Sequence, residues 1–257
     1  MNDFNRSFGA PNTMAPTMDM SVDQGLRAFM LGIYSKLALG IAVSGAIAWA
    51  VGAIPALTAL VFGTPLLYVV QFGPIALIFG SMFFMRNPSP VGSAVLYWTI
   101  VALIGAGLGI WVAAALGGDV LSSRAGTVYA PDILIIAKAF LITSSAFAAL
   151  SLWGYTTKRD LSGIGVFMIM ALMGVVVLSL LSLLFPPSGT FELIIQLAVL
   201  ALSAGLIAWE TQSLKEQYYA FAGDQRSLAT LTNWGALNFF ILFVNMFRII
   251  LSLLSSE

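Results

Sequence analysis

The stretch LIIQLAVLALSAGLIAW, residues 193–209, decides the fold class because it contains no charged residue and is long enough to cross a membrane. A helix that spans about 30 Å of hydrocarbon needs roughly 20 mainly apolar residues. The stretch ends at a carboxylate, Glu210, and the segment that follows is polar. The sequence therefore predicts a transmembrane helix that carries an ionisable side chain at one end.

The composition of the whole chain agrees with this prediction. Of the 257 residues, 60% are apolar and 9% are charged, and the formal net charge is zero. Water-soluble domains of this length carry many more charges. Because no basic field is available to hold phosphates, we expect no nucleic-acid partner. The expected surroundings of the protein are a lipid bilayer.

Seven windows have the length and composition of membrane spans, and charge, proline or glycine separates each from the next. The predicted fold is therefore all-α and integral to the membrane, a seven-transmembrane-helix bundle formed by residues 29–257. The longest predicted loop is the polar segment from Thr211 to Asn233. The seven windows are residues 31–53, 66–85, 91–116, 133–153, 162–184, 191–211 and 234–254.

Residues 1–28 come before these windows and lack the compact apolar core of a cleavable signal peptide. We expect them to form a mobile cytoplasmic tail. The positive-inside rule then assigns the two faces, because alternate loops separate cleanly by charge. The opposite loops hold only Arg124, so the N-terminus is predicted inside and the C-terminus outside. The predicted inside face collects Arg6, Arg27, Lys36, Arg86, Lys158, Arg159, Lys215 and Arg226.

Two side chains of opposite charge, Arg86 and Glu210, end spans that arrive at the predicted cytoplasmic face. A charge inside the bilayer is costly, so such residues either pair or serve a function. If the two helices are neighbours, an Arg86–Glu210 ion pair either anchors the helix ends or forms a charged gate. The sequence leaves both interpretations open. Lys36 and Lys138 lie near span ends, where long side chains can extend to the headgroups.

The seventh window adds two amides, Asn238 and Asn245, which are seven residues apart and so share one helical face. Asn245 is expected to bond a neighbouring helix. Asn238 lies one turn inside the cytoplasmic end, at the depth of Glu210, and its amide could donate a hydrogen bond to that carboxylate. In the third window, the glycines of GAGLG, residues 105–109, are expected to allow close helix packing.

The chain contains neither histidine nor cysteine. Imidazole and thiol chemistry, and the metal sites that these groups build, are therefore excluded. A lone intramembrane glutamate supplies no pair of nucleophile and base. We expect neither an enzyme nor a bound cofactor.

Four segments, taken together and in order, resemble the transmembrane Bax inhibitor motif family. They are FFMRNPSPVG (83–92), GYTTKRDLSGIG (154–165), WETQSLKEQ (209–217) and ALNFFILFVNMF (236–247). The resemblance implies six helices arranged around a central seventh, in the inner membrane, and a pH-sensitive leak of calcium ions. It also implies a sensor made of one carboxylate on the sixth helix, one on the seventh and an arginine near the end of the second.

The sensor transfers only in part to this chain. The sixth-helix carboxylate falls on Glu210 and the arginine on Arg86, but relatives that read LYLDFINLF have an aspartate where this chain has Leu242. Two carboxylates that share a proton titrate as a coupled pair, and a single one does not. The resemblance therefore implies a family fold with altered proton gating.

Two functions of different classes follow. The first is a leak for calcium ions or other cations, with Glu210, Arg86, Asn238 and Asn245 along the ion path and Glu210 as the one candidate metal contact. The second is a non-conducting regulator of a membrane-embedded protease, or of another quality-control or stress-response partner. In that case the N-terminal tail would be the segment that binds the partner.

Overall fold

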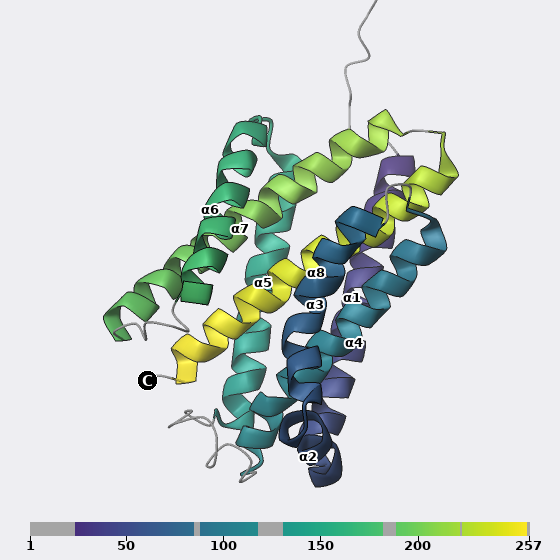
Figure 1. Cartoon of the computed structure of the whole chain (residues 1–257). Coiled ribbons are helices and arrows are strands. Elements are labelled where there is room, and N and C mark those ends of the chain that lie inside the picture. The colour runs from purple at the N-terminus through teal and green to yellow at the C-terminus, as the bar shows by residue number, and fades with distance from the viewer. Residues whose placement is uncertain (1–23, 85–87, 118–130, 182–188, 222, 256–257) are drawn as a thin grey trace, which may run out of the picture.

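A computed structural model of the chain describes residues 24–84, 88–117, 131–181, 189–221 and 223–255. All regular secondary structure in these residues is helical (Figure 1). The eight described helices are α1 (Gln24–Ala53), α2 (Pro55–Gly63), α3 (Leu66–Phe84), α4 (Pro90–Ala115), α5 (Ile133–Thr156), α6 (Ser162–Leu181), α7 (Gly189–Ala220) and α8 (Gln225–Ser255).

The all-helical membrane fold is confirmed, and each predicted span overlaps one of these helices. Within the described residues, α1, α4, α5, α7 and α8 are each long and apolar enough to cross a membrane. Helices α2 and α3 pass the same test together but are bent by 69°, and α6 contributes a shorter apolar stretch, Ser162–Val175. The described helices thus account for five spans, or six with the bent pair, and the count of seven stays a prediction.

Helix α2 was not predicted, because its residues were assigned to the connection between the first two spans. It begins at Pro55, in the first helical turn, where the missing N–H of proline breaks no hydrogen bond. The hydroxyl of Thr58 donates to the carbonyl of Val51 at 2.6 Å and ties the short helix to the end of α1. Pro55, which lies between two windows, therefore begins a new helix and not a turn.

The predicted loop from Thr211 to Asn233 is wrong. Helix α7 continues to Ala220 and α8 begins at Gln225, so the connection between them is short. Gly223 provides the turn with a φ of +96°, which favours glycine. Asp224 then accepts hydrogen bonds from the first backbone N–H groups of α8, and the bonds from Ser227 hold the pKa of this carboxyl below its ordinary value.

Helix α8 occupies the centre of the bundle. Its main neighbours are α1, α4, α5 and α7, and it has the largest buried share of the five candidate spans. Helices α3 and α6 lie further out, since α3 packs on α4 and α6 packs on α7. The last predicted span is thus central, although the surrounding helices do not all pack on it to the same extent. Figure 1 shows α8 crossing the bundle diagonally.

Glycines bring α1 and α4 into close contact, as the GAGLG stretch predicted. A Cβ atom at Gly105 would lie 2.8 Å from the carbonyl oxygen of Ser44, and one at Gly109 would lie 2.8 Å from the Cβ of Val51. Gly52 on α1 has the same role, since its Cβ would lie 2.6 Å from Val112. Small residues let the two backbones approach where lipid provides no hydrophobic drive.

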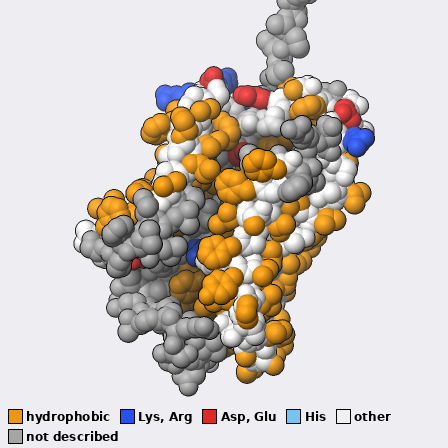
Figure 2. Space-filling model, viewed as in Figure 1, with side chains coloured by type: hydrophobic (Ala, Val, Ile, Leu, Met, Phe, Trp, Pro, Cys, Tyr) orange, Lys and Arg blue, Asp and Glu red, His pale blue; other side chains and the backbone are white. Residues whose placement is uncertain are grey.

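The outer surface has the distribution that a bilayer requires. Hydrophobic side chains cover the flanks of the bundle, and charged side chains gather at the end that holds the start of α1 and the α7–α8 turn (Figures 1 and 2). Helix α2 and the C-terminal end of α8 lie at the opposite end. The predicted tail lies outside the described residues except for residues 24–28, which form the first turns of α1.

Candidate functional site

The carboxylate of Glu210 is buried on α7 and is held by an amide of α8. The side chain of Glu210 is 7% exposed, and its Oε1 accepts a hydrogen bond from Nδ2 of Asn238 at 2.8 Å. The contact expected from the matching depths of the two residues is therefore confirmed. Among the described residues, Glu210 is the only acidic side chain that is buried.

Asn238 itself is exposed, in contrast to the acid that it holds. The amide therefore connects a buried carboxylate to the surface of the bundle. One turn further along α8, Leu242 is 8% exposed and belongs to the apolar core. A leucine side chain neither donates nor accepts a hydrogen bond, so at this position it offers Glu210 no polar partner.

Three polar residues mark one face of α8, and we call them the polar stripe: Asn238, Asn245 and Arg248. The spacings of seven and three residues place all three on one face of a helix. Asn238 and Arg248 are exposed and Asn245 is half-buried. At 1.5 Å per residue, the stripe runs roughly 15 Å along the helix from the level of Glu210. Sequence reasoning included the two asparagines in the site but left Arg248 out.

Arg86, the predicted partner of Glu210, lies outside the described residues. The ion pair between them, as an anchor or as a gate, stays a prediction.

The described residues contain no cluster of three or more acidic, histidine or cysteine side chains that could hold a metal ion. Calcium takes six to eight oxygen ligands in a resident site. Glu210 and the amide oxygen of Asn238 supply fewer oxygens than that.

A second polar cluster, which the sequence did not predict, joins α1, α4 and α8 around Asn233. This side chain is 3% exposed and donates to the carbonyl of Pro90 at 2.9 Å and to the hydroxyl of Ser93 at 2.8 Å. Its amide oxygen accepts a hydrogen bond from the ammonium of Lys36. Lys36 thus bonds another helix, whereas the sequence had suggested that it extends to the headgroups.

Two further clusters connect α5 with its neighbours. The ammonium of Lys215 on α7 donates to the carbonyl of Tyr155, near the end of α5, and lies 4.7 Å from the centre of the Tyr155 ring. It satisfies one of the last carbonyls of α5, which have no partner within the helix. Ser151 on α5 bonds Tyr34 of α1 and also lies 3.2 Å from the hydroxyl of Thr211 on α7.

We expect Asn233→Ala to lower the free energy of unfolding by about 2 kcal/mol, because it removes the hydrogen bonds to Lys36, Ser93 and Pro90 that join α8 to α1 and α4. Thermal unfolding of the purified protein in detergent measures the change. Asn245→Ala, which removes a half-buried amide from the same helix, is the control and should melt near the wild type. Equal melting temperatures for the two variants would contradict a role for Asn233 in joining the helices.

The matches to known proteins extend over nearly the whole chain. A family model described as "Inhibitor of apoptosis-promoting Bax1" matches residues 26–257. An uncharacterized protein of Caulobacter vibrioides is 44% identical, over 98% of this chain and 97% of its own. An uncharacterized protein of Rickettsia prowazekii is 31% identical, over 91% and 92%. The inner membrane protein YbhL of Escherichia coli is 27% identical, over 91% and 93%.

Proposed function

The chain belongs to the Bax inhibitor family, whose model matches it from residue 26 to residue 257, and on that basis we propose that it is a calcium-leak protein whose ion path passes Glu210. Its likeness to an inner membrane protein of Escherichia coli, together with its apolar helices, supports a multi-pass position in the inner membrane. The observation that carries the proposal is the buried carboxylate of Glu210, bonded to the exposed amide of Asn238.

The position of Glu210 argues for a role beyond stability. On insertion scales a charged side chain costs about 3 kcal/mol at the centre of a bilayer and less toward the end of a span, where Glu210 is predicted to lie. An ionisable residue within a membrane helix is therefore a candidate for an ion or proton path. Within the described residues, the carboxylate has an amide as its hydrogen-bond partner instead of a cation. No described cation therefore neutralises this carboxylate, which can contact a positive ion that approaches along α8.

The polar stripe supplies the next contacts along the proposed path. Asn238 and Asn245 offer amide oxygens, which are among the ligands that calcium accepts. Conduction requires binding that is favourable enough to draw the ion in and weak enough to let it leave. One carboxylate and two separated amides meet both conditions better than a complete coordination shell would.

Arg248 closes the polar stripe with a positive charge, at the end further from Glu210. A fixed positive charge raises the electrostatic barrier to a divalent cation on the same face. A slow leak fits this arrangement better than rapid conduction. Leu242 adds the second feature of the proposal, a pH response weaker than that of relatives with an acid at that position.

We expect Glu210→Gln to lower calcium flux by roughly tenfold, because the amide keeps the size of the side chain but removes the negative charge that attracts the ion. The measurement is calcium uptake into proteoliposomes that enclose a fluorescent calcium indicator. Glu216→Gln is the matched control, since Glu216 lies on the same helix and is exposed. It should conduct like the wild type.

Two outcomes would contradict the proposal. Wild-type flux that equals that of empty vesicles would exclude the leak, and equal flux in the Glu210→Gln and Glu216→Gln variants would exclude the path past Glu210. Thermal unfolding of all three proteins, measured in the same detergent, shows whether a loss of flux comes from a loss of fold.

A further inference from the structure

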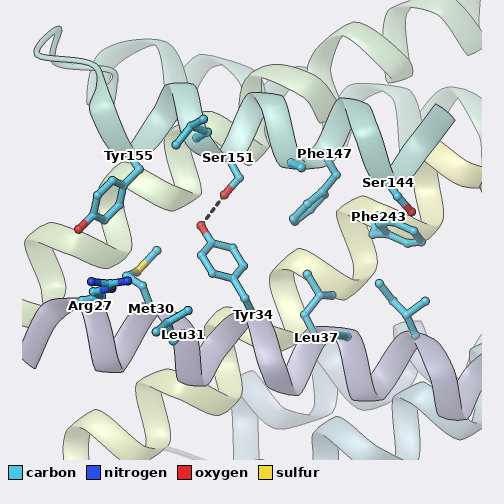
Figure 3. Close-up of a pocket in the computed structure, with 14 residues that line it drawn as sticks. Arg27, Met30, Leu31, Tyr34, Leu37, Ser144, Phe147, Ser151, Tyr155 and Phe243 are labelled. Carbon is cyan, nitrogen blue, oxygen red and sulfur yellow. Dashed lines mark hydrogen bonds between the residues drawn. The ribbon is translucent and has the colours of Figure 1, made fainter. Parts of the chain in front are cut away.

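A long groove lies between α1 and α5, on a part of the bundle that the proposed ion path does not use. The first portion is a cavity of 620 Å³ whose walls are side chains of these two helices, with Phe243 of α8 at its inner side (Figure 3). Helices α1 and α5 each pack on α8 but are not main neighbours of one another, which explains the opening between them.

A second cavity of 480 Å³ continues the groove toward the other end of the bundle. The two cavities share Ile41 and Phe243, and the second extends to Trp49 on α1 and Ile133 on α5. From Arg27 to Trp49 the groove follows α1 for roughly 33 Å at 1.5 Å per residue. That length matches the hydrocarbon thickness of a bilayer, about 30 Å.

The walls of the groove are mostly apolar, and small side chains keep it open. Ala38 on α1 and Ser144 and Ala148 on α5 line its first portion, together with aromatic residues. The hydrogen bond between Tyr34 and Ser151 bridges the two helices part of the way along, as Figure 3 shows. Apolar cavities of this kind do not hold water well, so in a membrane an apolar chain is the natural filling.

The end of the groove near the start of α1 carries one guanidinium, that of Arg27. Arg27 lines the cavity there and is exposed. Tyr155 lines the same end, and the ammonium of Lys215 lies over its ring. Figure 2 shows basic and acidic side chains together at this end of the bundle. A guanidinium in this position matches a phosphate, which it can bind through two parallel hydrogen bonds.

We propose that the first portion of the groove between α1 and α5 binds one anionic phospholipid, with its phosphate at Arg27 and one acyl chain along the apolar walls toward Ile41. The charge at one end and the apolar walls of the remainder together select this occupant. The lipid would fill the gap that α1 and α5 leave beside α8. This inference does not depend on whether the protein conducts calcium.

The test uses a phosphatidylglycerol that carries a photoreactive diazirine on its acyl chain, in proteoliposomes of the full chain. We expect labelled peptides from α1 and α5. Ala148→Phe, which fills the groove, should reduce this labelling several-fold. Ala149→Phe is the matched control, because it makes the same change one residue further along α5, at an exposed position that does not line either cavity.

A second arm tests the headgroup without altering the groove walls. Arg27→Gln should lower labelling by phosphatidylglycerol about fivefold, the effect of one basic residue at an anionic membrane surface, and leave labelling by phosphatidylcholine unchanged. Arg226→Gln removes an exposed charge that does not line either cavity and should have no effect.

Equal labelling in the Ala148→Phe and Ala149→Phe variants, or in Arg27→Gln and Arg226→Gln, would overturn the proposal, because the lipid contact would then be that of any bilayer. Labelling confined to helices other than α1 and α5 would overturn it as well.

Discussion

Leu242→Asp should give this protein a calcium flux that depends steeply on pH. The new carboxylate would stand one helical turn after Asn238, which already bonds Glu210. Placed to share a proton, the two acids would titrate as a coupled pair in two separate steps, so the charge beside the proposed ion path would change between acidic and neutral pH. We expect the flux of the variant to differ by about tenfold between acidic and neutral buffer, and that of the wild type to differ much less.

Proteoliposomes with a calcium indicator, assayed in a series of buffers from about pH 5 to about pH 8, measure this dependence. Leu242→Asn is the control, because it places a polar group of the same size in the apolar core but cannot bind or release a proton there. Profiles of the Leu242→Asp and Leu242→Asn variants that coincide would show that no coupled pair forms. The missing acid would then not explain any weak pH response of the wild type.

Gly154→Ala should have the largest effect on the stability of the bundle. A Cβ atom at this position would lie 2.3 Å from the carbonyl oxygen of Ala208 and 2.7 Å from its Cα. These are backbone atoms of α7, so the added methyl can be accommodated only if α5 and α7 move apart. Overpacking of this kind costs about 3 kcal/mol, which corresponds to a melting temperature lower by about 10 °C.

Circular dichroism of the purified protein in detergent measures the melting temperature. Gly174→Ala on α6 is the matched control, since a Cβ atom there would meet no atom within 4 Å. It should leave stability unchanged or raise it slightly, because alanine favours a helix more than glycine does. Similar melting temperatures for the two variants would mean that α5 and α7 can separate at little cost.

Hydropathy predicted where the helices lie but not where they end. Apolar windows report which residues face hydrocarbon, and α7 and α8 continue beyond those windows as polar helices. The boundary between α7 and α8 is set by two adjacent residues, Gly223, which forms the turn, and Asp224, which caps the start of α8. Helix α2 was missed for a similar reason, because Pro55 is as compatible with the first turn of a helix as with a loop.

Part of the candidate site followed from depth and spacing alone. Glu210 ends one span and Asn238 begins another at the same face, so their hydrogen bond could be predicted without knowledge of the bundle. The cluster around Asn233 could not, because it depends on which helices become neighbours. The sequence shows that Lys36, Ser93 and Asn233 are polar. Their hydrogen bonds to one another depend on how α1, α4 and α8 pack.

The central place of α8 has a consequence for how the protein is made. A ribosome synthesises α8 after its neighbours α1, α4, α5 and α7, so these helices enter the membrane before the helix that they surround exists. During that interval α1 and α4 can already associate through Gly105 and Gly109. The Asn233 cluster and the Glu210–Asn238 bond form only when α8 arrives. Assembly of this bundle is therefore completed by its central helix. A chain that stopped before α8 would lack the helix on which α1, α4, α5 and α7 pack.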